Sequence, residues 1–245
     1  MSLKINFFLI SKIILILLPI TFITGPFLPD LFLSLLSLIY LINLLKNKQW
    51  GDFNNIFILI FVFFYFLILV SGIISVDPYY SLVEYNGPIF YFRYILFILA
   101  INDLLNKDKS ILDNFTLVLF CTVLFVSFDG YFQFIFGFNI FGWITEDVNR
   151  ITGVFRDEQL LGHFLSLIFP LLLSLLVFKF GTGLKNTFYY LFLLILIEII
   201  IFISGDRSGF FRIFQFTLLL IFLSNHHKVF RLAALFISLV FIALL

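Results

Sequence analysis

Long apolar runs, separated by short polar stretches, follow one another along most of the chain. A helix that crosses a bilayer needs roughly 20 predominantly apolar residues, and the sequence contains about nine such runs, of which the second and the eighth are short. To within a few residues, the predicted spans are 5–23, 31–45, 56–75, 88–105, 115–137, 160–179, 187–204, 210–224 and 230–245. The pattern therefore predicts an all-α, polytopic membrane helix bundle that forms a single transmembrane domain over residues 1–245.

The composition agrees with this fold class. Of the 245 residues, 62% are apolar and 12% are charged, and the mean hydropathy is +1.17. A soluble globule of this length could not cover so much apolar surface, so we expect membrane lipids around the protein. The formal net charge of +1 gives no basic field for nucleic acid. No metal site is expected, because Cys121 is the single cysteine and His226 and His227 form an isolated pair.

The lysines predict the orientation of the chain. If the N-terminus is cytoplasmic, every lysine lies at the inner end of a predicted helix, as the positive-inside rule requires. The lysines are Lys4, Lys12, Lys46, Lys48, Lys107, Lys109, Lys179, Lys185 and Lys228. The inner loops are therefore expected to be short, positively charged connections.

The arginines follow a different pattern. Those on the predicted outer side, or in the outer part of a span, are Arg93, Arg150, Arg156, Arg207 and Arg212, whereas Arg231 is cytoplasmic. Because the topology rule treats lysine and arginine alike, an outer set made of arginine alone needs a second explanation. Arginine presents a planar fork that binds phosphate or carboxylate through two hydrogen bonds, whereas lysine offers a point charge. We therefore expect the outer face to bind an anion.

Two simpler explanations stay open for these arginines. Their side chains can extend to the phosphates of outer-leaflet lipids. They can also pair with nearby carboxylates and fasten loops; the nearby carboxylates are Asp147, Asp157, Glu158 and Asp206. Neither explanation requires a ligand site.

The depth of four ionisable groups favours a shared site. At a rise of about 1.5 Å per residue, Arg93 lies about 7 Å inside the outer boundary, Asp129 about 12 Å, Glu198 about 9 Å and Arg212 about 4 Å. Exposure of each charge to lipid would cost a few kcal/mol, so a shared polar cavity is expected, with an arginine beside Asp129 or Glu198. For Glu198 alone, a protonated carboxyl bonded to one neighbouring hydroxyl serves equally well.

The outer loop 138–159 is the candidate binding segment. Its tryptophan and phenylalanines suit either the membrane interface or the face of a sugar ring. Gly153, and Gly162 in the next helix, allow close backbone approach. Gly162 with Ser166 forms a small-xxx-small pattern for contact with a neighbouring helix, although structural packing alone explains both glycines.

Three stretches resemble, in order and spacing, the bacterial O-antigen ligase and O-antigen polymerase superfamily. They are "DGYFQFIFGFNIFGW", "NRITGVFRDEQLLGHFLSLIFPLLL" and "ISGDRSGFF", and "FRYILF", which contains Arg93, is similar more loosely. The matched positions are Asp129, Gly130, Gln133, Gly137, Arg150, Gly153, Phe155, Glu158, Gly162, Pro170, Ser204, Arg207 and Ser208. The resemblance covers residues 88 to 224, and the first three spans agree with the family only in hydropathy.

The resemblance implies a function. Members of this superfamily are glycosyltransferases, so the protein is expected to transfer a glycan from undecaprenyl diphosphate to a saccharide acceptor, such as lipid A core or a growing glycan, at the periplasmic face of the bacterial inner membrane. The substrate-binding residues are then Arg93, Arg150, Arg156, Arg207, Arg212, Asp129 and Gln133. Guanidinium groups would stabilise the leaving diphosphate, so no cofactor, nucleotide or metal is needed. Glu158 and His163 are the candidates for the group that takes the acceptor's proton.

The sequence departs from the family at its C-terminal end. Family members continue into a large periplasmic loop, which carries a histidine thought to act in catalysis, and then into further spans. This chain ends earlier, which leads us to expect a truncated form that holds the donor site without the complete catalytic set. His163 lies where the family pattern varies, and the expected role is packing or substrate contact.

Two other classes of function remain open. A transporter or flippase for a lipid-linked glycan would also need arginines in an outward cavity, although such proteins usually have two similar halves, and no repeat relates the first four spans to the last four. A non-catalytic membrane partner would agree with the expected truncation.

The lysine pattern makes a topological prediction. Cysteines introduced at Asn149 and Gly205 should react with a membrane-impermeant thiol reagent added outside intact cells, whereas cysteines at Asn47 and Thr182 should not. Labelling at Thr182 from outside would reverse the orientation and place the arginines in the cytoplasm.

Overall fold

The computed structural model describes residues 7–47, 56–84, 87–144, 150–156, 158–223, 236 and 240. Within these residues the chain is helical, apart from connections and one isolated antiparallel bridge between Phe138 and Ile144. Seven helices of the described part of the chain are long and apolar enough to cross a membrane. The predicted all-α, polytopic class is confirmed.

The chain divides into two compact units, Met1–Phe115 and Thr116–Leu245. The boundary falls inside one long helix, α5, which covers Ser110–Phe136. Each unit is described by itself below.

The first unit is built from four long helices: α1 (Phe7–Thr21), α2 (Phe27–Asn47), α3 (Ile56–Ile74) and α4 (Phe92–Lys107). Helix α2 is longer than the predicted span of 31–45. Its first turn contains Pro29, whose missing N–H is not needed there, and Asp30, which the positive end of the helix dipole favours. Asp30, which was expected to precede the helix, therefore lies in its first turn.

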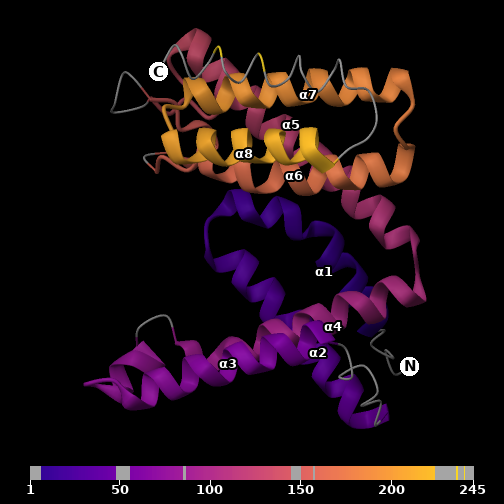
Figure 1. Cartoon of the computed structure of the whole chain (residues 1–245), viewed down its shortest axis with the longest axis vertical. Helices are drawn as coiled ribbons and strands as arrows, with labels where there is room; N and C mark the ends of the chain where they lie inside the picture. Colours follow the sequence, from indigo (N-terminus) through magenta and orange to yellow (C-terminus); the bar gives the residue numbers. More distant parts are fainter. Residues whose placement is uncertain are drawn as a thin grey trace. The chain divides into compact units, whose positions relative to one another are not determined.

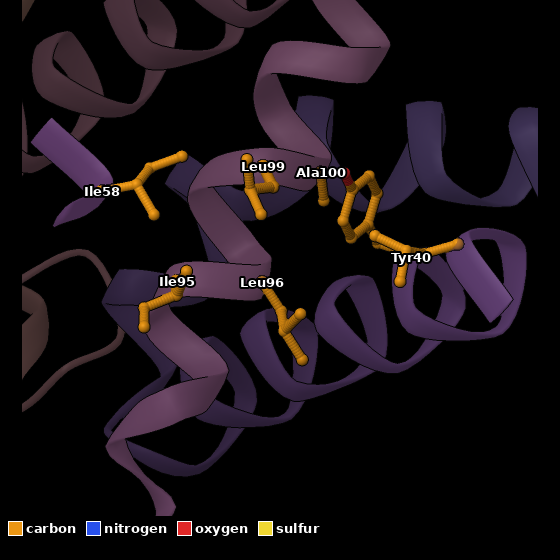
Figure 2. Packing of buried hydrophobic residues seen from close by; sticks show 7 residues of the cluster. Tyr40, Ile58, Ile95, Leu96, Leu99 and Ala100 are labelled. Atoms are coloured by element: carbon orange, nitrogen blue, oxygen red, sulfur yellow. The ribbon is translucent and has the colours of Figure 1, made fainter. Parts of the chain in front are cut away.

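Apolar side chains of α2, α3 and α4 form the core of the first unit. Figure 2 shows this cluster, in which Leu99 and Ala100 of α4 lie near Tyr40 of α2. The buried members are Tyr40, Leu44, Ile58, Ile95, Leu96, Leu99 and Ala100. On α3 only Ile58 and Gly72 are buried, as expected for a helix whose apolar surface faces lipid rather than water.

An ion pair connects α1 to the α4–α5 connection. Lys12 Nζ lies 2.6 Å from Asp108 Oδ2. This hydrogen bond, followed by those from Ser110, lowers the pKa of Asp108 to about 2. The carboxylate is therefore ionised, and the pair intact, throughout the neutral range.

The second unit contains most of α5 together with α6 (Leu161–Phe180), α7 (Leu184–Ile203) and α8 (Arg207–Leu223). Figure 1 shows α6, α7 and α8 running alongside one another, and each of the three contacts the other two. Fully buried apolar side chains of this unit include Leu161, Leu165, Phe169, Leu172, Ile197, Ile200, Ile201 and Ile213. The ninth predicted span, 230–245, lies outside the described residues except for positions 236 and 240.

Helices α6 and α8 meet through their backbones at two glycines. A methyl group at Gly209 would lie 2.7 Å from the carbonyl oxygen of Gly162, and one at Gly162 would lie 2.6 Å from Ser204 Oγ. Neither position has room for a side chain, since real Cβ atoms do not approach so closely. Of the predicted small-xxx-small pair, Gly162 lies against Gly209 of α8, and Ser166 accepts a hydrogen bond from Arg212 of the same helix.

The close contact predicts a different outcome for two Gly→Ala changes. Gly209→Ala should lower the free energy of unfolding by about 1–3 kcal/mol, because the new methyl group meets backbone that cannot move aside without separating the helices. The control is Gly183→Ala at the start of α7, where nothing lies within 4 Å of the added Cβ. Thermal unfolding in detergent, followed by circular dichroism, compares the two. An equal effect of both changes would contradict the close contact.

Candidate functional site

Two buried carboxamides organise the loop between α5 and α6. Gln133 Oε1 accepts the backbone N–H groups of Thr152, at 3.1 Å, and Gly153, at 2.7 Å. Asn139 Oδ1 accepts from the N–H groups of Phe141 and Trp143, while Asn139 Nδ2 donates to Gly153 O. Both side chains are buried, with 4% and 0% of their surface exposed. Gln133 therefore anchors the α5–α6 loop to the end of α5, and Asn139 joins two parts of the loop to each other.

Asp129 adds a second anchor. It lies one helical turn before Gln133, so both side chains leave the same face of α5, and its Oδ1 accepts the N–H of Ile140 at 2.8 Å. A methyl group at Gly153 would lie 3.1 Å from Asp129 Oδ2, and the φ of Gly153 is +56°. Glycine is thus required at 153 both for its backbone conformation and for the close approach of the carboxylate.

These positions change the role assigned to Asp129 and Gln133. The sequence predicted that both contact substrate directly, yet 0% and 4% of their surfaces are exposed and their oxygens bind loop backbone. We therefore assign them to holding the loop in position. Asn139 does the same and was not singled out from the sequence, although its place three residues before Gly142 is typical of a turn.

Arg156 lies in a strained turn of the same loop. Its φ is 57° and its ψ is −118°, and Glu158 N donates to Phe155 O at 3.1 Å across it. The φ and ψ of Arg156 are those of the first central residue of a type II′ turn, a position where glycine is preferred. Such strain occurs where the surrounding structure fixes the residue, commonly at binding sites.

The guanidinium of Arg156 stacks on a tryptophan. Its Cζ lies 4.2 Å from the ring centre of Trp143, and Trp143 also stacks with Phe141. A stacked guanidinium keeps the edge that carries its N–H groups available for hydrogen bonds. Trp143, expected at the membrane interface or against a sugar, contacts this arginine.

An open polar cavity of about 350 Å³ lies where the α5–α6 loop meets the start of α8. We call it the polar cavity; it is lined by Arg150, Gln159, Ser204, Gly205, Asp206, Arg207 and Ser208. Arg150 Nη1 donates to Gln159 Oε1. Asp206 caps α8, since its Oδ1 accepts from Gly209 N at 3.0 Å and from Ser208 Oγ at 2.7 Å. With two arginines, one carboxylate used as a helix cap and the positive end of a helix dipole, the cavity favours an anion.

Arg212, one turn further along α8, contacts three groups. Its Nη1 donates to Ser166 Oγ at 3.3 Å, and its Nη2 lies 2.9 Å from Ser208 Oγ and 2.8 Å from His163 Nδ1. Ser208 also lines the polar cavity. Arg212 and His163 therefore belong to the same group of side chains as Arg207 and Arg150.

The remaining predicted groups are satisfied separately. Arg93, in the first unit, forms an ion pair with Asp30, with Nη2 2.6 Å from Oδ1, and its Nη1 donates a hydrogen bond to Oδ2 at 2.9 Å. Glu198 accepts from the hydroxyl of Thr217 at 3.0 Å, which is the alternative that the sequence left open for it. Among the described residues, the ion pair of Arg93 is with Asp30 of α2 rather than with Asp129 or Glu198.

The other candidates are exposed or lie outside the described residues. Glu158 is exposed beside Gln159, and His163 is also exposed. Asp147 and Asp157, expected as possible partners of the arginines, lie outside the described residues.

Comparison of the chain with protein-family models, curated proteins and solved structures gives no match in any of the three. Function is therefore inferred from the chemistry of the polar cavity together with the resemblance of the sequence stretches around it.

Proposed function

We propose that the protein is a membrane glycosyltransferase of the O-antigen ligase or polymerase type. It binds the diphosphate of an undecaprenyl-linked glycan in the polar cavity. It then transfers the glycan to a hydroxyl of a saccharide acceptor, such as lipid A core or a growing glycan, at the periplasmic face of the bacterial inner membrane.

The observation that carries this proposal is the composition of the polar cavity. Arg150 and Arg207 line it from two different segments, and the single carboxylate, Asp206, is engaged in capping α8. A diphosphate brings two negative charges and several acceptor oxygens, which suit guanidinium forks and a helix N-terminus. The cavity also lies next to the stretches that resemble the superfamily.

Transfer would proceed by substitution at the sugar carbon that is bonded to the diphosphate. The acceptor oxygen forms the new bond to this carbon, and the bond to the diphosphate oxygen breaks with its electrons leaving on the diphosphate. Arg150 and Arg207 would stabilise the charge that grows on that oxygen. The interaction is stronger in the transition state than before it, so it accelerates the reaction.

The acceptor's hydroxyl proton must go to a base. Glu158 and His163 are the two candidates, and their surroundings differ. Nδ1 of His163 contacts Arg212, which can only donate hydrogen bonds, whereas Glu158 is an exposed carboxylate. Glu158 is therefore the proposed base.

Exchange of arginine for lysine in the polar cavity tests the proposal. Arg150→Lys and Arg207→Lys keep the charge but lose the fork, so each should weaken donor binding and slow transfer about 10- to 100-fold, the value of one or two charge-assisted hydrogen bonds. The measurement uses proteoliposomes with an undecaprenyl-diphosphate-linked oligosaccharide and a saccharide acceptor, and it follows binding and product separately.

Arg93→Lys is the matched control. The fork of Arg93 is occupied by Asp30 in the first unit, so this exchange should leave donor binding nearly unchanged. Unaltered binding in both cavity variants would reject the diphosphate site. Donor binding that is sensitive to these exchanges, without any transfer, would point instead to a flippase or a non-catalytic partner.

A further inference from the structure

The contacts of Arg212 fix the hydrogen-bond direction around it. Its Nη2 lies 2.8 Å from His163 Nδ1 and 2.9 Å from Ser208 Oγ. A guanidinium carries only donors, so Nδ1 of His163 must accept through its lone pair. A ring nitrogen that accepts bears no proton, and the imidazole proton therefore lies on Nε2.

A carboxylate reinforces the same direction. Ser208 Oγ lies 2.7 Å from Asp206 Oδ1, to which it gives its hydroxyl hydrogen, because the oxygen of an ionised carboxylate can only accept. The lone pairs of Ser208 Oγ then receive the N–H of Arg212. Arg212 therefore donates a hydrogen bond to Ser208, which donates one to Asp206. Arg212 also donates to His163. The direction of these hydrogen bonds cannot be reversed, because a guanidinium only donates and an ionised carboxylate only accepts.

His163 is held beside the polar cavity by its neighbour in sequence. A Cβ on Gly162 would contact Ser204 Oγ at 2.6 Å and Asp206 Cβ at 2.7 Å, and both residues line the cavity. The His163 side chain is exposed. Its remaining polar group, Nε2–H, is therefore a donor on an exposed side chain that Arg212 and Ser208 link to the lining of the cavity.

From this arrangement we infer that His163 binds the anionic ligand of the polar cavity by donating a hydrogen bond from Nε2–H, and that Arg212 is a positioning residue that holds the ring in this tautomer. The inference rests on the proposed function for the identity of the ligand, a diphosphate. It excludes His163 as the base, because the one nitrogen with a lone pair is already occupied. Arg212 then acts on the ligand through His163 rather than by direct contact.

Two amide substitutions of His163 test the roles of its two ring nitrogens separately. Asparagine places an amide oxygen near the position of Nδ1 and can keep the contact with Arg212, but it offers nothing at Nε2. Glutamine places its amide N–H near the position of Nε2. We therefore expect His163→Gln to bind inorganic pyrophosphate nearly as well as the unaltered chain, and His163→Asn to bind on the order of tenfold more weakly.

The tautomer itself is measured by ¹⁵N NMR of the full chain in detergent micelles, with the His163 signals identified by their loss in the His163→Gln variant. The expected spectrum has the proton on Nε2, a shift of that proton on addition of pyrophosphate, and loss of the single tautomer in Arg212→Gln. A structural role alone would not produce the shift on addition of pyrophosphate.

The outcomes distinguish the two proposals. If the unaltered chain binds neither pyrophosphate nor undecaprenyl diphosphate in nanodiscs, the proposed function is rejected, and the ligand role of His163 with it. If the unaltered chain binds but His163→Asn binds equally well, or if Nδ1 carries the proton, the inference about His163 is wrong while the diphosphate site stands.

Discussion

The backbone contact between α6 and α8 is the constraint on which the site in the second unit depends. Gly162 and Gly209 bring the two helices together without intervening side chains. The residues that follow on each helix, His163 and Ser166 on α6 and Arg212 on α8, are then within hydrogen-bond distance. A charged group inside a membrane costs several kcal/mol unless polar groups surround it. The glycines therefore lower the free-energy cost of placing the charge of Arg212 in the membrane, since a wider spacing of the two helices would remove its hydrogen-bond partners.

A second constraint acts on the opposite side of the polar cavity. The α5–α6 loop carries Arg150 and Arg156, and its backbone groups would be costly to leave unbonded near a membrane. Gln133 and Asn139 satisfy several of them from buried positions. With the loop held in this way, Arg156 can keep a backbone conformation that an unanchored loop would relax. The loop that carries these arginines is thus held in position by buried polar side chains of α5 and of the loop itself.

Sequence patterns predicted the features that depend on local periodicity. The helical class, most span positions and the contact through Gly162 and Ser166 follow from spacing along one helix. The shared cavity was expected to be lined by Arg93, Arg156, Arg207 and Arg212, whereas the arginines that line the polar cavity are Arg150 and Arg207. Ion pairs between helices could not be predicted in the same way, because they depend on which helices are neighbours. The ion pair of Arg93 with Asp30 on α2 is an example.

The same limit applies to the roles of the buried polar residues. Depth alone indicated that Asp129 and Glu198 need partners, and it suggested arginines. The structure shows hydrogen bonds to these two residues from the Ile140 N–H and the Thr217 hydroxyl, and such neutral groups occur throughout any chain and so give no signal in sequence. Asn139 had a signal in its turn residues, but its burial depends on the fold of the whole loop.

The most direct test of the central claim, that the contact of α6 with α8 gathers these polar groups into one site, is an electron cryomicroscopy structure of the chain in a lipid nanodisc with a bound antibody fragment. We predict that Gly162 and Gly209 will be in backbone contact and that the Arg212 guanidinium will lie within hydrogen-bond distance of His163 Nδ1 and Ser208 Oγ, beside the cavity formed by Arg150 and Arg207. Separated helices, with Arg212 directed toward lipid headgroups, would contradict the account.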